Sequence, residues 1–231
     1  MKLGVNDIAK MIDISAVQTS HGEKEINELI GIACTYGFVA IHVLPCWVPY
    51  VSAHLPYDSS IMIGAPVGFP SGGHTTEIKV AEAKRLVADG VDEMDMMINV
   101  GKLKSKDFAY VENEISSIVK AVPIPVKVIL EVQYLTKTEI KKACEICIRA
   151  GASFVKTSTG WTGISTSLEV VELITSFVGD AIQVKVSGGI RNLDTLVAMY
   201  RMGVTRFGIN AQASMNIHNE VSAMPGKCVE I

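Results

Sequence analysis

The sequence lacks any cluster of basic residues. Its 21 Lys and Arg residues are outnumbered by 24 Asp and Glu residues, which gives a formal net charge of -3 and a pI near 6.0. No run rich in Lys and Arg occurs along the chain. A protein that binds nucleic acid usually presents a concentrated basic surface, so this composition argues against such a partner.

Long hydrophobic runs are also missing. Although 48% of the residues are hydrophobic, no apolar run approaches the roughly 18 residues that a membrane-spanning helix needs. The N-terminus, MKLGVNDIAKMID, lacks the unbroken apolar core of a signal peptide. We therefore expect no membrane partner and a cytoplasmic location.

Cysteine is scarce, and its pattern does not suggest disulfides. The five cysteines are odd in number and scattered, which suits reduced thiols better than a disulfide framework. Cys144 and Cys147 have the spacing of half a zinc or redox motif, but no second pair accompanies them. They lie in a segment that favours a helix, so we expect buried apolar thiols. The histidines share no metal-ligand spacing, and the sequence predicts neither a metal nor a cofactor.

The chain contains no linker, low-complexity tract or charge block, so we expect one domain over residues 1–231. Within it, short runs rich in Val, Ile and Met alternate with longer amphipathic stretches that carry helix start and stop signals. The predicted strands are residues 11–17, 38–45, 61–69, 93–99, 125–132, 154–159, 182–188 and 206–210. The predicted helices are residues 22–37, 74–90, 106–122, 136–151, 167–179 and 192–203.

Eight strands that alternate with helices are typical of an α/β fold, the (β/α)₈ TIM barrel, and the chain length suits such a barrel with short loops. An open doubly wound sheet is the structural alternative. In a barrel, reactive groups sit near the C-terminal ends of the strands. Charged residues inside strands that otherwise require burial are therefore the first candidates for chemistry.

Three lysines lie inside successive apolar strands: Lys127, Lys156 and Lys185. A mid-strand ammonium group finds no water unless its strand lines a cavity. One such lysine alone would as readily be an edge residue that reaches solvent, but three on neighbouring strands converge on the barrel axis. Burial and a nearby cation both lower the pKa of an amine. We predict that Lys156 is a nucleophile toward a carbonyl and that Lys185 keeps it unprotonated.

Other titratable residues inside strands are candidate proton carriers. Asp95 is flanked by apolar residues on the fourth strand, and Asp13 lies similarly on the first. A Schiff-base reaction needs such a carboxylate, but either could instead close a structural ion pair, an alternative that is stronger for Asp13. We interpret Glu93, at a strand start, as a solvated carboxylate without a role. We interpret His42 as a satisfied core histidine rather than a proton carrier.

Two glycines, Gly188 and Gly189, follow the seventh predicted strand. Loops after strands seven and eight of such barrels commonly bind phosphate through backbone amides and a helix N-terminus. The alternative is that both glycines only permit a tight turn. The position favours a phosphorylated substrate.

Four segments, in this order, closely resemble deoxyribose-phosphate aldolase: EMDMMINVGKLKS, KVILEVQYLT, FVKTSTGW and VKVSGGIR. The likeness extends from residues 12–13 through YGF and IGAPVGFPSG to RFG at 206–208, and so covers most of the chain. The resemblance implies a class I lyase that reversibly cleaves 2-deoxy-D-ribose 5-phosphate to D-glyceraldehyde 3-phosphate and acetaldehyde without metal or organic cofactor. It also implies a role in deoxyribonucleotide catabolism and a homo-oligomer.

The resemblance assigns roles residue by residue. The family's Schiff-base lysine falls on Lys156, its second active-site lysine on Lys185 and its proton-handling aspartate on Asp95. The residues expected to bind substrate are Gly188, Gly189, Asn210, Lys127 and Asp13.

Three segments depart from the family pattern. They are DIS at residues 13–15, HVLPCW at 42–47 and INA at 209–211, where the family usually has hydroxyl residues that help to hold the phosphate. Two alternatives therefore stand beside the leading hypothesis: an aldolase of the same type acting on another sugar phosphate or aldehyde, and a catalytically silent sugar-phosphate-binding homologue. A non-covalent barrel isomerase or synthase is a third, but it would not need the lysines.

Overall fold

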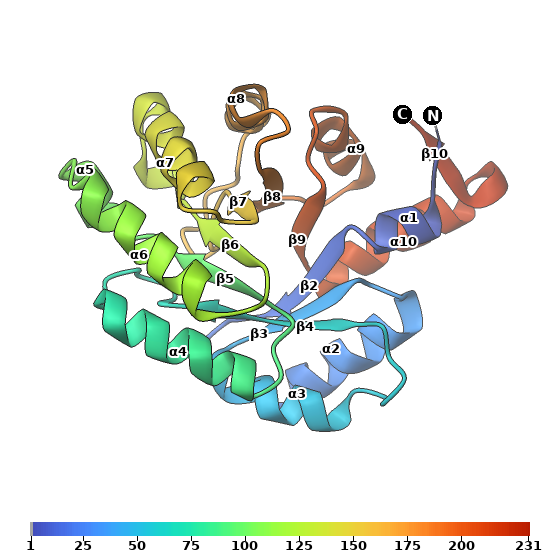
Figure 1. Cartoon of the computed structure of the whole chain (residues 1–231). Coiled ribbons are helices and arrows are strands. Elements are labelled where there is room, and N and C mark those ends of the chain that lie inside the picture. Colours follow the sequence, from blue (N-terminus) through green and yellow to red (C-terminus); the bar gives the residue numbers. More distant parts are fainter. Residues whose placement is uncertain (1) are drawn as a thin grey trace.

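A computed structural model describes residues 2–231 as a closed barrel of eight parallel strands surrounded by helices (Figure 1). The ring closes where the first barrel strand pairs with the last, with Asp13 opposite Gly208. The predicted TIM barrel is therefore confirmed. In order around the ring, the strands are β2 (Ile12–Ala16), β3 (Ala40–Val43), β4 (Met62–Val67), β5 (Glu93–Met97), β6 (Val126–Ile129), β7 (Phe154–Lys156), β8 (Gln183–Ser187) and β9 (Arg206–Asn210).

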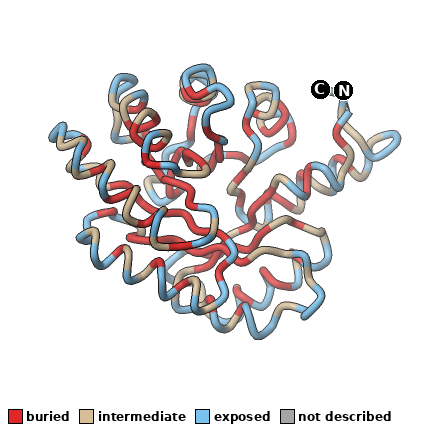
Figure 2. Tube along the Cα trace, in the orientation of Figure 1, coloured by how far each residue is buried: buried red, intermediate tan, exposed pale blue. Residues whose placement is uncertain are grey.

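Helices cover the outside of the ring, and the strands are buried on both faces. Figure 2 shows the strands mostly buried and the outer surfaces of the helices mostly exposed. Parallel strands require this cover, which explains their nearly continuous apolar sequences. The main helices are α2 (Glu23–Tyr36), α4 (Thr76–Ala88), α6 (Phe108–Ala121), α7 (Lys137–Arg149), α8 (Leu168–Val178), α9 (Leu193–Arg201) and α10 (Ala211–Ala223).

Each predicted strand and helix is present, and the helix ends lie within two residues of the predicted ones. The capping signals explain this accuracy. At the start of α7, the Thr136 hydroxyl accepts from the Glu139 amide at 3.3 Å, and the Glu139 carboxylate accepts from the Thr136 amide at 2.7 Å. Strand β7 ends at Lys156, earlier than predicted, and the Thr159 amide donates to the Glu131 side chain instead of to a backbone carbonyl.

Several elements were not predicted from the sequence. They are β1 (Lys2–Gly4), α1 (Val5–Ala9), α3 (Val48–His54), α5 (Val100–Lys104), α10, β10 (Cys228–Glu230) and the short turns η1 (Pro45–Trp47), η2 (Val132–Tyr134) and η3 (Pro225–Lys227). Most are too short to show a period. Helix α10 is long, but its buried side includes the small residues Ala213 and Ser214, which weaken the apolar pattern. Strands β1 and β10 form an antiparallel ribbon that brings both described ends together (Figure 1).

A buried ion pair joins α4 to α6 outside the ring. Lys79 and Glu114 are both fully buried, with Lys79 Nζ 2.8 Å from a Glu114 oxygen. Lys79 also donates to the Met97 carbonyl at 2.8 Å, and Glu114 accepts from the Asn99 amide at 3.3 Å. Burial lowers the pKa of Lys79 and raises that of Glu114, against the attraction of each for the other. The pair therefore ties the end of β5 to two helices.

Two further predictions concern the described residues. Cys144 and Cys147 are buried thiols on α7, as predicted, and burial raises the pKa of Cys144 to about 12. Across residues 2–231, none of the helices is both long and apolar enough to cross a membrane.

Candidate active site

A cavity of about 250 Å³ opens at the C-terminal ends of the barrel strands. This is the end at which (β/α)₈ barrels carry their reactive groups, because the loops there vary without disturbing the ring. Seven of the eight predicted site residues line the cavity: Asp13, Asp95, Lys156, Lys185, Gly188, Gly189 and Asn210. Lys127 does not line it.

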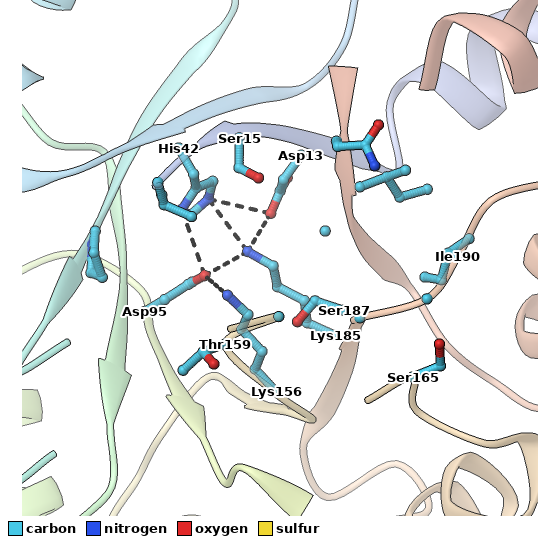
Figure 3. Close-up of a pocket in the computed structure, with 18 of the residues that line it drawn as sticks. Asp13, Ser15, His42, Asp95, Lys156, Thr159, Ser165, Lys185, Ser187 and Ile190 are labelled. Carbon is cyan, nitrogen blue, oxygen red and sulfur yellow. Dashed lines mark hydrogen bonds and ion pairs between the residues drawn. The ribbon is translucent and has the colours of Figure 1, made fainter. Parts of the chain in front are cut away.

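Two lysines and one aspartate form the centre of the site. Lys156 and Lys185 point from neighbouring strands toward Asp95 (Figure 3). Their Nζ atoms lie 2.8 and 2.7 Å from the same oxygen, Asp95 Oδ2. Lys185 also lies 2.7 Å from Asp13 Oδ2. Two of the three lysines predicted to converge on the barrel axis, Lys156 and Lys185, therefore meet at the cavity.

The environment separates the two amines electrostatically. Burial lowers the pKa of Lys156, the charge of Lys185 lowers it further, and Asp95 opposes both without reversing the direction. Burial also disfavours the charge of Lys185, but Asp13, Asp95 and Glu93 outweigh it and raise its pKa above the usual value. Burial opposes ionisation of Asp95 as well, yet Lys156 and Lys185 hold its pKa well below the usual range. Lys156 is thus the amine suited to be a nucleophile.

A second layer of charges lies below this centre. Lys127 is fully buried, and its Nζ lies 2.7 Å from Glu93 and 3.5 Å from Asp95. Arg206 contacts Asp13 at 2.5 Å and Glu93 at 3.3 Å. Lys127 therefore supports the carboxylates from beneath, and the structure gives it no place on the cavity wall, where substrate binding was expected.

The interpretation of Glu93 as a solvated strand-start carboxylate is wrong. Glu93 is 2% exposed and contacts Lys127, Arg206 and His42. Glu93 was predicted to be solvated because it begins a strand. In this barrel, however, residues at strand starts face the packed interior. Arg206, at the start of β9, was missed for the same reason. The alternation of side chains along β5, which places Glu93 on the face of Asp95, was the available signal.

His42 is not an ordinary core histidine. It lines the cavity, is 4% exposed and contacts carboxylates on two different strands (Figure 3). On the adjacent strand its ladder partner is Gly64. A Cβ atom at Gly64 would lie 2.3–2.6 Å from the imidazole ring, so only glycine leaves room for it. The prediction of a buried, hydrogen-bonded histidine within a strand is confirmed, and the contacts with three carboxylates were not predicted.

The glycine loop after β8 has the backbone that was expected of it. Gly188 and Gly189 have positive φ angles of 89° and 90°, a conformation that favours glycine. A Cβ atom at Gly189 would lie 2.2 Å from the Ser165 hydroxyl, so the loop also packs closely against the β7–α8 loop. Asn210, expected to bind substrate, accepts from the Ala213 amide at 2.9 Å and thereby caps α10. Its oxygen is committed to the helix.

A set of hydroxyl groups, missed at the sequence level, locks the ends of β7 and β8 together. The carbonyl of Ser187 accepts from Thr157 at 3.0 Å, from Ser158 at 2.7 Å and from Thr166 at 2.9 Å. The Ser187 amide donates to the Thr157 hydroxyl at 3.0 Å. These bonds hold the strands of Lys156 and Lys185 side by side just above the two amines.

Trp161 joins three loops at the mouth of the cavity. Its indole nitrogen donates to the Val17 carbonyl at 3.2 Å, across from the loop after β2. Its ring meets Phe69 edge-on, with centroids 5.4 Å apart. Val17 and Phe69 both line the cavity, whereas Trp161 is 37% exposed. This contact makes one side of the cavity mouth apolar.

Among residues 2–231, one group of side chains has the spacing of metal ligands: Asp13, His42 and Glu93, whose ligand atoms lie within 4.8 Å of one another. Lys185 and Arg206 already contact Asp13, and Lys127 contacts Glu93. Because these cations balance the carboxylates, we interpret the group as an ion-pair network rather than a metal site.

A buried lysine amine with a lowered pKa, facing a cavity at the C-terminal end of a closed parallel barrel, defines a class: barrels that capture carbonyl compounds as imines. Comparison with known proteins gives the family. The chain belongs to the DeoC/LacD family aldolases, whose model matches residues 11–208.

Relatives agree along nearly the whole chain. The chain is 50% identical over 230 residues to a deoxyribose-phosphate aldolase of Rhizobium meliloti (strain 1021), covering 99% of this chain and 93% of that protein. A deoxyribose-phosphate aldolase of Klebsiella pneumoniae is 41% identical over 226 residues, covering 96% and 91%. Among solved structures, the aldolase QR15 is 40% identical with a TM-score of 0.87, covering 93% and 95%. A tetrameric deoxyribose phosphate aldolase of Aeropyrum pernix is 26% identical with a TM-score of 0.85, covering 95% and 92%.

Proposed function

We propose that this chain is a class I aldolase that reversibly cleaves 2-deoxy-D-ribose 5-phosphate to D-glyceraldehyde 3-phosphate and acetaldehyde. The observation that carries the proposal is the position of Lys156, whose amine faces the cavity beside Asp95 and Lys185. The names of the relatives supply the substrate, and the family match supplies the reaction class.

The proposed reaction begins with attack of the Lys156 amine on the aldehyde carbon of the substrate. Loss of water gives a protonated imine, which withdraws electrons from the neighbouring carbon. Asp95 then accepts the proton of the C3 hydroxyl as the C2–C3 bond breaks, and an enamine remains on Lys156. Glyceraldehyde 3-phosphate leaves, Asp95 returns its proton to C2 of the enamine, and attack of water on the resulting imine releases acetaldehyde and the free Lys156 amine. Lys185 stays charged throughout, lowers the pKa of Lys156 and favours the ionised form of Asp95 before the proton transfer.

The phosphate group of the substrate is proposed to bind at the glycine loop. The positive φ angles of Gly188 and Gly189 shape a turn beside the cavity, where backbone amides can meet an anion. Arg191 also lines the cavity from the end of this loop. Asn210 contributes to this end chiefly by capping α10, whose N-terminus adds a favourable dipole.

A catalytically silent binding protein fits the site less well. Keeping an amine buried beside a second lysine is unfavourable, and a protein that only binds sugar phosphates gains nothing from it. An aldolase of the same type with another carbonyl substrate shares all the covalent features. The experiment below separates these alternatives.

Borohydride reduction in the presence of candidate substrates tests the proposal. With 2-deoxyribose 5-phosphate or acetaldehyde, we expect a stable adduct on Lys156 by peptide mass spectrometry. Lys156→Met should abolish both the adduct and turnover, whereas Lys84→Met, an exposed lysine on α4, should leave both unchanged. An adduct that forms only with other carbonyl compounds would support the covalent mechanism and identify a different substrate. No adduct with any of them, in folded protein, would refute the covalent mechanism.

Assembly and location are further proposals. We propose that the chain forms a homo-oligomer, supported by the tetrameric aldolase of Aeropyrum pernix. We propose that it acts in the cytoplasm, in the breakdown of deoxyribonucleotides, which the reduced cysteines of the described chain support.

A further inference from the structure

His42 stands where the two layers of charge meet. Its Nε2 atom lies 3.0 Å from Glu93 Oε1 and 3.3 Å from Asp13 Oδ2. Its Nδ1 atom lies 3.6 Å from Asp95 Oδ2, the oxygen that also accepts from both lysines of the centre. One buried imidazole therefore reaches Glu93 and Asp13 through one nitrogen and Asp95 through the other. Figure 3 shows its contacts with Asp13 and Asp95.

The carboxylates beside Nε2 determine which nitrogen carries the ring proton. Burial opposes ionisation of Glu93, but the hydrogen bond from His42 and the charge of Lys127 outweigh it and lower the pKa of Glu93 to about 2. Asp13 is ionised too, because Lys185 and His42 overcome its burial and hold its pKa well below the usual range. Ionised carboxylates only accept hydrogen bonds, and two of them lie at 3.0 and 3.3 Å from Nε2 against one at 3.6 Å from Nδ1, so we assign the ring proton to Nε2. The lone pair of Nδ1 then faces Asp95.

The formal charges around His42 balance when the ring is neutral and Lys156 is a free amine. Three carboxylates on β2 and β5 face three cations on β6, β8 and β9, namely Asp13, Glu93 and Asp95 against Lys127, Lys185 and Arg206. Of these cations, Lys185 lies next to the ring, with Nζ 3.4 Å from Nε2. A proton that arrives on Nδ1 would thus enter a balanced site with three carboxylates within 3.6 Å of the ring to stabilise it.

We propose that His42 is a positioning residue that stores a proton for Asp95 during the aldolase reaction. The inference rests on the proposed function and adds a residue to its proton path. His42 touches no reacting atom in this scheme and acts only through Asp95. Hydrogen bonds between catalytic groups are often long in the free enzyme and shorten in the reacting complex, which suits the 3.6 Å separation of Nδ1 from Asp95.

The step balances for the acetaldehyde imine on Lys156. The C2–H bond breaks, its electron pair forms the enamine double bond, and the iminium nitrogen becomes neutral. The proton bonds to an oxygen of Asp95. That O–H bond then breaks as a new N–H bond forms at Nδ1, which leaves Asp95 ionised and His42 as an imidazolium that still donates to Glu93. Enamine protonation follows the same path in reverse.

Separate measurements of imine formation and proton transfer test this role. Exchange of the acetaldehyde methyl protons in D₂O, followed by NMR, requires the enamine, whereas borohydride trapping on Lys156 requires only the imine. His42→Gln keeps a donor for Glu93 but cannot store a proton. We expect it to keep trapping and to slow the exchange by about 100-fold, within the usual range for one acid–base group. Added imidazole should speed the exchange in His42→Ala, which leaves space beside the cavity.

Gly64 supplies a matched control, because the methyl group of Gly64→Ala would meet the His42 ring first, at 2.3–2.6 Å, and displace it. It should slow exchange in the wild-type background and have little further effect in His42→Ala. Exchange by His42→Gln within about threefold of wild type would overturn the proposal. Parallel loss of trapping and exchange in both His42→Gln and His42→Asn would also overturn it, since His42 would then build the Lys156 site. Wild-type protein that neither traps nor exchanges would instead refute the aldolase function.

Discussion

Lys156 and Lys185 are directly opposite each other on β7 and β8, and both donate to the same oxygen of Asp95. Two ammonium groups in such a position repel each other, and one carboxylate oxygen does not compensate both. The site resolves the conflict through its surroundings. Lys185 has Asp13 in addition and stays charged, while Lys156 has only Asp95. Pairs whose pKa values are driven apart in this way commonly divide catalytic roles between them.

The first prediction concerns Lys185→Leu. Removing this cation takes away a charge that lowers the pKa of Lys156, so that pKa should rise. A raised pKa leaves less free amine at neutral pH, and activity there should fall by about 100-fold or more. Activity should recover in part at high pH, so the acid limb of the kcat/KM profile shifts upward. If the acid limb of the profile does not shift, Lys185 acts in direct proton transfer and does not tune the pKa of Lys156.

The second prediction concerns acid stability. The folded-state pKa of Glu93 is about 2, below its ordinary value of 4.5. Such a group stabilises the fold above about pH 4.5, and that contribution is lost as the pH falls toward 2. Glu93→Gln should therefore lower the Tm at pH 7 and flatten its fall between pH 5 and 2. Circular dichroism melts check this against Glu172→Gln, an exposed site on α8 that should match wild type.

The third prediction concerns the buried Lys79–Glu114 pair. Lys79→Met leaves an uncompensated carboxylate between α4 and α6 and should reduce the free energy of unfolding by about 3–5 kcal/mol. The double variant Lys79→Met/Glu114→Gln removes both charges and keeps an acceptor for the Asn99 amide, so it should recover much of that loss. Urea denaturation of both variants measures the difference. Equal losses in the two variants would show that the ion pair itself is not the source.

The fourth prediction concerns phosphate binding. Gly189→Ala places a methyl group against Ser165 and strains a positive φ angle. The KM for 2-deoxyribose 5-phosphate should rise about tenfold or more, as expected for lost hydrogen bonds to a charged group. Activity on unphosphorylated 2-deoxyribose should change less. Gly203→Ala, with a similar φ of 98° and a place outside the lining of the active-site cavity, controls for backbone strain. If Gly189→Ala affects both substrates equally, the phosphate group does not bind at the glycine loop.

The sequence predicted the barrel well because its signals are local. Strands covered on both faces are apolar throughout. Helix ends are marked in the sequence by capping residues, such as Thr136 at the start of α7 and Gly37 at the end of α2. Elements without a local signature were missed. The ribbon of β1 and β10 depends on pairing across the whole chain, with Leu3 opposite Val229, and no short window of sequence contains that relationship.

The site was predictable where charge interrupts an apolar strand, as at Lys156 and Asp95. It was not predictable where charge sits at a strand start, as at Glu93 and Arg206, because that position is solvated in many folds and buried in this one. The carboxylate contacts of His42 could not be predicted for another reason. Its partners lie on strands 29 and 51 or more residues away in the chain, so only the closed ring brings them together.

The contacts of Trp161 give the cavity an optical reporter. The chain has only two tryptophans, and Trp47 stacks edge-on with Tyr50, at a separate place in the fold. In a Trp47→Phe variant, the remaining indole fluorescence comes from a residue bonded to Val17 and packed on Phe69, both of which line the cavity. Ligand entry that moves either loop changes the solvation of this ring. Stopped-flow emission can therefore follow occupancy in the native chain without an added dye.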